Sequence, residues 1–148
     1  MLLQKRILFL ILVFVSGCAS TGEKLSPEEM YIRASALTKL SSAMESYVRY
    51  GSPLAGQNDA QLLAEGTKHN PALITNMGDY KIRVLSQERH AVVLMCTKAG
   101  DRALLEDAGC TGKVDAHHWK KKNVPCEFTL LLPATCAVSQ GNRTGAGG

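Results

Sequence analysis

The chain has 148 residues and a formal net charge of +4 at pH 7, which is too small a positive charge to favour nucleic-acid binding. It contains only three Phe and one Trp, so its core must be mainly aliphatic. A chain of this length suffices for one domain around one hydrophobic core. Composition therefore predicts a single domain with no nucleic-acid partner.

Residues 1–17 have the pattern of a secretory signal peptide. Lys5 and Arg6 precede the apolar run Ile7–Val15, and small residues then lead to Cys18. The apolar run is far shorter than the roughly 20 residues that span a bilayer. We therefore expect residues 1–17 to be removed, which lowers the net charge of the remainder to +2, because Lys5 and Arg6 are lost.

The sequence Val15-Ser16-Gly17-Cys18 resembles the lipobox of bacterial lipoproteins. This resemblance implies cleavage before Cys18 and acylation of both its thiol and the new amino terminus. Stable anchoring takes at least two acyl chains, and lipoproteins carry two or three. In Gram-negative lipoproteins, Ala19 after the cysteine implies the outer membrane, on its periplasmic face. The alternative is an ordinary cleaved signal with a coincidental cysteine.

The remaining chain divides into a tether, a domain and a tail. Residues 18–25 are the lipidated cysteine and a polar tether, of which Ala19–Leu25 reaches at most about 25 Å when extended. Residues 26–138 form the single periplasmic domain, and residues 139–148 form a tail that is Gly-rich and expected to be disordered. The short tether keeps the domain close to the membrane surface.

The first element of the domain is a long helix over Pro27–Tyr50. Ser26 and Glu29 form a capping box, Pro27 suits the first helical position, and Gly51 ends the helix. Apolar residues recur at three- and four-residue steps, which predicts a stripe packed on a sheet. This stripe comprises Met30, Ala34, Leu37, Leu40, Met44, Tyr47 and Val48.

A second, weaker apolar strip lies on the other side of this helix. It holds Ile32, Ala36, Ala43 and Tyr50. As a hypothesis, Ile32 and Tyr50 bind a partner protein through this strip. The alternative is that these are scattered surface residues.

The elements that follow predict an α+β fold. A second helix is expected over Asp59–Lys68, begun by Asn58 or Asp59, and a further turn over Pro71–Met77. His90–Cys96 is a continuous apolar run, typical of a buried central strand. The other expected strands are Tyr80–Leu85, Arg102–Leu105 and Cys126–Leu132, the last closed by Pro133. The order is two N-terminal helices followed by a small antiparallel sheet.

Four cysteines remain after cleavage: Cys96, Cys110, Cys126 and Cys136. An even number in an exported chain predicts two disulfides, with three possible connectivities. Short separations favour Cys96–Cys110 and Cys126–Cys136. A zinc site would need spacings such as Cys-x₂₋₄-Cys, which the chain lacks, so no metal is expected.

The densest polar cluster is Asp115-Ala116-His117-His118-Trp119. Paired histidines beside a carboxylate suit metal binding or proton transfer. However, adjacent residues of a strand point to opposite faces, so a solvated loop with Trp119 packed inward is favoured. Glu106 and Asp107 are adjacent carboxylates, but adjacency does not place them across a substrate. We therefore expect no catalytic residue and no cofactor.

These observations lead to an expected function. The chain is predicted to be an outer-membrane-anchored periplasmic lipoprotein, acting as a non-enzymatic accessory or assembly factor that binds another envelope protein. One alternative is a binder or inhibitor of a soluble molecule, such as an incoming hydrolase. A third is an enzyme that uses the His117–His118 region.

Overall fold

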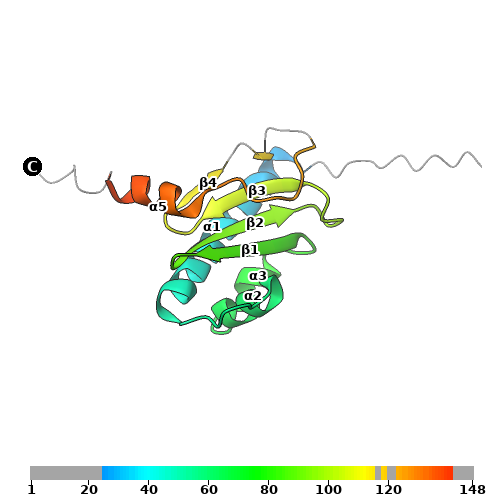
Figure 1. The fold of residues 1–148 in the computed structure, drawn as a ribbon. Coiled ribbons are helices and arrows are strands. Elements are labelled where there is room, and N and C mark those ends of the chain that lie inside the picture. The colour runs from blue at the N-terminus through cyan, green and yellow to red at the C-terminus, as the bar shows by residue number, and fades with distance from the viewer. Residues whose placement is uncertain (1–24, 116–117, 120–122, 142–148) are drawn as a thin grey trace, which may run out of the picture.

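A computed structural model describes residues 25–115, 118–119 and 123–141. The predicted signal peptide, Cys18, most of the predicted tether, His117 and residues 142–148 lie outside this range. The elements run α1 (Pro27–Tyr50), α2 (Asp59–Thr67), α3 (Ala72–Thr75), β1 (Lys81–Gln87), β2 (His90–Cys96), β3 (Ala103–Ala108), β4 (Lys113–Asp115) and α5 (Leu132–Gly141). The four strands form an antiparallel sheet in the order β1-β2-β3-β4 (Figure 1). The predicted α+β class is confirmed.

Helix α1 has the predicted bounds, because local signals determine both ends. The Ser26 hydroxyl accepts a hydrogen bond from the Glu29 amide at 3.2 Å, and Glu29 Oε2 accepts one from the Ser26 amide at 3.0 Å. Helix α2 begins with the same reciprocal arrangement between Asn58 and Gln61. Each capping box satisfies amides that the first helical turn leaves without partners.

Among the described residues, no helix is long and apolar enough to cross a membrane.

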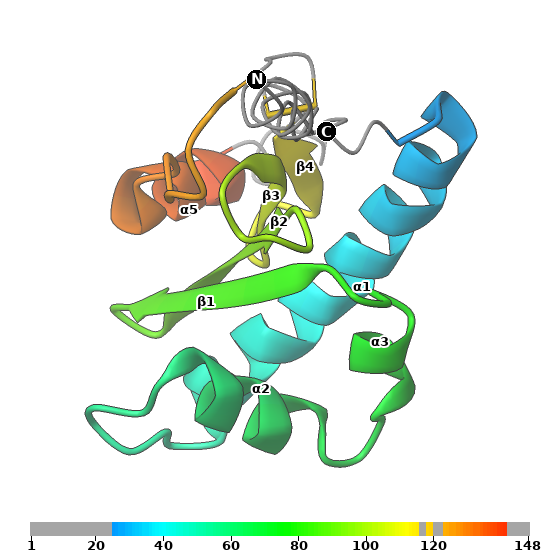
Figure 2. The same cartoon turned by 90° about the vertical axis from the view of Figure 1, so that its right-hand side faces the viewer.

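The sheet is covered on both faces, which explains the continuous apolar run of β2. Ala91, Val93 and Met95 belong to the main core with the buried stripe of α1. The alternate residues, Val92 and Leu94, pack instead under the C-terminal segment. Figure 2 shows α1 and α5 on opposite sides of β2 and β3. The prediction of a buried central strand and a core-facing helical stripe is therefore confirmed.

The disulfides pair as Cys96–Cys126 and Cys110–Cys136, with Cα separations of 5.8 and 5.6 Å. The sequential pairing expected from the sequence is wrong. Cys96 ends β2 beside Ala103, whereas Cys110 follows the far end of β3. At about 3.3 Å per residue, β3 separates these two positions by roughly 20 Å, well beyond disulfide reach. Both bridges instead attach the C-terminal segment to the sheet.

The segment after Cys126 also differs from the prediction. Residues 126–131 form no strand, and Pro133 lies in the first turn of α5 instead of closing a strand. Proline is tolerated there because the first helical amides have no intrahelical partner. The fourth strand is the three-residue β4, too short to leave a periodic signal. Helix α5 continues to Gly141, beyond the predicted end of the domain at residue 138.

Candidate functional site

An open groove lies between the N-terminal half of α1 and the residues of and just after α3. Its volume is about 790 Å³. Ile32 and its neighbour Tyr31 are both exposed beside it, at 59% and 68%. The lining comprises Tyr31, Ile32, Arg33, Ser35, Ala36, Lys39, Thr75, Asn76 and Gly78. The groove therefore combines large apolar side chains with two cations and includes no carboxylate.

Arg33 is held in place at the wall of this groove. Its Nη1 donates to the Asn76 carbonyl oxygen at 2.5 Å, and its guanidinium lies 5.3 Å from the centre of the Tyr80 ring. Gly78 adopts a φ of +65° where the chain leaves α3, close to the same guanidinium. Lys39, one helical turn beyond Ser35, is exposed. The groove thus presents one ordered positive charge and one exposed positive charge.

Tyr31 also contacts the C-terminal half of the molecule. Its ring meets Trp119 edge to face, with 4.8 Å between centroids. Trp119 packs against the main core, as the sequence predicted. Aromatic pairs of this geometry add about 0.5–1.5 kcal/mol beyond their buried area. Tyr31 is therefore oriented although most of its surface is exposed.

Ile32 and Tyr50 are both exposed, but they lie at opposite ends of α1. At about 1.5 Å per residue they are roughly 27 Å apart along the helix axis. The polar residues Lys39 and Ser46 follow Ile32 at seven-residue steps, so they interrupt the apolar strip on that face. Ala36 is partly buried against the core. The two residues therefore belong to two separate surfaces.

The surface at the Tyr50 end contains a hollow of about 460 Å³ between the end of α1 and the β1–β2 turn. Tyr50 and Leu54 are exposed at this end, at 75% and 77%. Three non-glycine residues that line the hollow have positive φ: Ser52 (53°), Glu88 (49°) and Arg89 (64°). Glu88 and Arg89 are the central residues of the hairpin, a turn that normally uses Asn-Gly. Such backbone strain concentrates at functional sites.

The sequence analysis predicted a polar cluster around His117 and His118. In the structure, Glu106 is the residue to which the described part of this cluster is hydrogen-bonded. His118 is buried, and its Nε2 lies 3.0 Å from Glu106 Oε2 and 3.5 Å from Asp115 Oδ2. Glu106 also accepts hydrogen bonds from the amides of Thr129 and Leu130 and from the Thr129 hydroxyl. The prediction of a solvated loop is therefore wrong for His118. Sequence reasoning missed Glu106 as its partner, because β3 and the segment after β4 meet only in the folded chain.

This cluster has the donor types of a metal site, since atoms of Glu106, Asp115 and His118 lie within 4.8 Å of one another. However, both Glu106 oxygens already accept hydrogen bonds from the protein. A cation would have to displace these donors. The geometry fits an internal anchor that holds residues 129–130 against the sheet.

Asp107, the other adjacent carboxyl, points to the opposite face of β3. It is fully buried and hydrogen-bonded to the Ser41 hydroxyl of α1. Its Oδ1 has no hydrogen-bond partner among the described residues. Burial raises the pKa of this carboxyl, although the hydrogen bond from Ser41 opposes the shift. The two carboxyls thus serve different faces of the sheet and share no site.

No protein-family model matches this chain, and no curated protein or solved structure matches it. The fold and its surfaces define a small α+β domain with two disulfides, an apolar and basic groove at one end, and a strained hollow at the other.

Proposed function

We propose that this chain is an outer-membrane-anchored periplasmic lipoprotein that binds another envelope protein as a non-enzymatic accessory or assembly factor. The observation that carries the proposal is the groove between α1 and α3, where Tyr31 and Ile32 are exposed beside Arg33 and Lys39. Exposed large apolar residues grouped at a concave surface are typical of protein-binding sites.

The charge of the groove specifies the chemistry of its partner. Two cations without a carboxylate in the lining favour a partner segment that carries an acidic side chain next to an apolar one. The groove begins only a few residues after the predicted tether, whose reach is about 25 Å. A partner in the membrane, or at its surface, is therefore within reach of this end of the domain.

Photo-crosslinking in native envelopes tests the proposal. A photoreactive residue in place of Ile32 should form one dominant adduct with an envelope protein, and the adduct should be lost in the Cys18→Ala variant. Lys39→Glu should reduce the adduct at least about fivefold by placing like charges together. Lys68→Glu is the matched control, because Lys68 is exposed, directly follows α2 and lies outside the groove. No adduct from position 32, or equal losses in both charge variants, would contradict the proposal.

A second function is favoured by the strain at the other end of the molecule. Ser52, Glu88 and Arg89 hold left-handed backbone conformations around a hollow beside the exposed Tyr50 and Leu54. This surface lies at the end of α1 away from Pro27 and suits a soluble protein, such as an incoming hydrolase. A photoreactive residue at position 50 that captures a soluble protein, with or without Cys18, would support this alternative over the first.

A further inference from the structure

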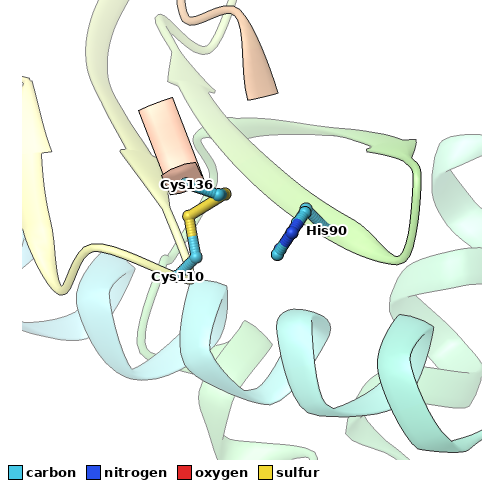
Figure 3. A group of neighbouring side chains, drawn as sticks. All are labelled: His90, Cys110 and Cys136. Carbon is cyan, nitrogen blue, oxygen red and sulfur yellow. A yellow bond between two sulfur atoms is a disulfide. The ribbon is translucent and has the colours of Figure 1, made fainter. Parts of the chain in front are cut away.

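The second disulfide lies beside an ordered histidine. A ring nitrogen of His90 and the sulfurs of Cys110 and Cys136 lie within 4.8 Å of one another. Figure 3 shows His90, at the start of β2, beside the bridge and close to α1. Because the two cysteines are bridged, these three side chains are not a metal-ligand set in this state.

Helix α1 orients the imidazole. Glu45 Oε1 lies 2.7 Å from His90 Nδ1, and Glu45 Oε2 accepts the Ala91 amide at 2.7 Å. Arg49 Nη2 also contacts Glu45 Oε1 at 2.7 Å. Arg49 Nη2 lies 3.2 Å from His90 Nδ1 as well, so Glu45 and Arg49 together hold this side of the ring. A carboxylate on one side of an imidazole and a sulfur near it is the arrangement in which an imidazole exchanges a proton with a sulfur nucleophile or leaving group. Glu45, His90 and the Cys110–Cys136 bridge have this arrangement.

The other disulfide is a natural control for this arrangement. In each bridge one cysteine is fully buried, Cys96 or Cys136, and the other is half-buried, Cys126 or Cys110. The sequence separations, 30 and 26 residues, are also similar. Among the described residues, Arg83 is a cation close to Cys96–Cys126; it donates to the Cys126 carbonyl oxygen, and a guanidinium does not transfer a proton. The two bridges therefore differ chiefly in the imidazole.

We infer that the Cys110–Cys136 bridge is a thiol–disulfide exchange site for dithiols, with His90 as the proton donor to the departing sulfur, and that Cys96–Cys126 is purely structural. An imidazole exchanges protons near neutral pH, and a sulfur leaves more readily when its developing charge is neutralised. This inference is independent of the proposed partner groove.

The reaction is a stoichiometric two-electron exchange. A thiolate of the dithiol attacks Cys110 Sγ, because Cys110 is the less buried cysteine of the bridge, and forms a mixed disulfide. The electron pair of the broken S–S bond moves to Cys136 Sγ, which takes a proton from the imidazolium form of His90; the imidazole then regains a proton from water. The second thiol of the dithiol loses its proton to water, and its thiolate attacks the dithiol sulfur of the mixed disulfide. This closes the disulfide of the dithiol, and Cys110 leaves as a thiolate that takes a proton from water. The dithiol is oxidised and the protein bridge is reduced.

Reduction would release α5 from the end of β3. Cys136 packs with Val92, Ala108 and Leu132 in a small cluster, and the bridge is the covalent link between that cluster and β3. Residues 123–131 remain attached through Cys96–Cys126. The exchange would therefore change the mobility of one helix and leave the rest of the domain in place.

The test is differential alkylation of the native protein during timed exposure to dithiothreitol at pH 7, with both bridges followed by peptide mapping. Cys110–Cys136 should be reduced at least about tenfold faster than Cys96–Cys126. His90→Gln should bring the ratio of the two rates close to one. Both reduction rates are measured in the same sample. A general destabilisation of the variant would therefore accelerate the reduction of both bridges, and the ratio of the two rates would still report the effect of His90.

Two outcomes would overturn the inference. One is a wild-type ratio near or below one. The other is a ratio that His90→Gln leaves unchanged, which would assign the faster reduction to exposure alone. If His90→Gln does not fold, His90→Asn is the replacement variant, since it keeps a polar side chain at the start of β2.

Discussion

Gly109 lies so close to Ser41 that a Cβ on Gly109 would sit 2.3 Å from the Ser41 carbonyl oxygen. The same Cβ would lie 2.5 Å from the Glu45 Cβ. Gly109 also donates its amide to the Ala91 carbonyl at 3.0 Å. The end of β3 is thus pressed onto the backbone of α1 at a point where no side chain fits.

Gly109→Ala is therefore expected to destabilise the domain by about 2–3 kcal/mol, because the backbone of α1 has to move. Gly112→Ala is the control, since no atom lies within 4 Å of its Cβ position and only its φ of +61° opposes the change. That substitution should cost about 1 kcal/mol. Urea unfolding measures both, and equal losses of stability would contradict the close packing of Gly109.

Asp107→Asn is expected to stabilise the domain at neutral pH. Burial raises the pKa of Asp107, so the folded state keeps its proton at pH values where the unfolded chain has lost it. Stability therefore falls as the pH rises from about 3.8, the ordinary value, through the raised pKa. The amide of the variant stays neutral at every pH and removes this loss.

A protonated Asp107 also satisfies the local hydrogen bonds. The Ser41 hydroxyl lies within hydrogen-bond distance of both Asp107 and the Thr38 carbonyl oxygen, and it has only one proton to donate. At pH 7 the variant should unfold about 3–6 °C higher, for a gain on the order of 1 kcal/mol. The difference should shrink as the pH approaches 4. Thermal unfolding between pH 4 and 8 tests this prediction, with Asp79→Asn as the control because Asp79 is exposed. A difference in unfolding temperature that stays constant with pH would contradict it.

Glu106→Gln is expected to destabilise the domain by about 2–4 kcal/mol. The Gln side chain can keep its oxygen on the Thr129 and Leu130 amides only by turning its NH₂ toward the Thr129 hydroxyl and His118. The hydrogen bond that the Thr129 hydroxyl donates to Glu106 is then lost, together with the negative charge that all these contacts share. Hydrogen exchange should show the Thr129 and Leu130 amides losing protection first. Glu127→Gln is the control, two positions before Thr129 and with an exposed side chain, and it should change neither the free energy of unfolding nor the exchange rates. Unaltered protection in Glu106→Gln would show that the anchor is not formed.

The disulfide connectivity makes a direct prediction for peptide mapping without reduction. Linked peptides should contain Cys96 with Cys126 and Cys110 with Cys136. Replacing either pair by alanines should cost about 3.5 kcal/mol in the chain-entropy model, because the loops have similar lengths. A map with Cys96–Cys110 would require the ends of the sheet to meet and would contradict the fold.

The local parts of the fold were determined by the sequence itself. The bounds of α1 follow from Ser26, Glu29 and Gly51, and the buried stripe follows from its three- and four-residue steps. The central strand β2 follows from one unbroken apolar run. These features depend on interactions between residues close in the chain, so a pattern of neighbours is sufficient to predict them.

The contacts that suggest function were decided only by the tertiary structure. Antiparallel pairing of β2 and β3 places Cys96 and Cys110 at opposite ends of the sheet, so each must bond to the returning C-terminal segment. The same pairing brings His90 beside the Cys110–Cys136 bridge. The groove likewise exists only because α3 folds back on α1. Residues far apart in the chain meet through strand register and layer packing, and these global properties leave no periodic signal in any single segment.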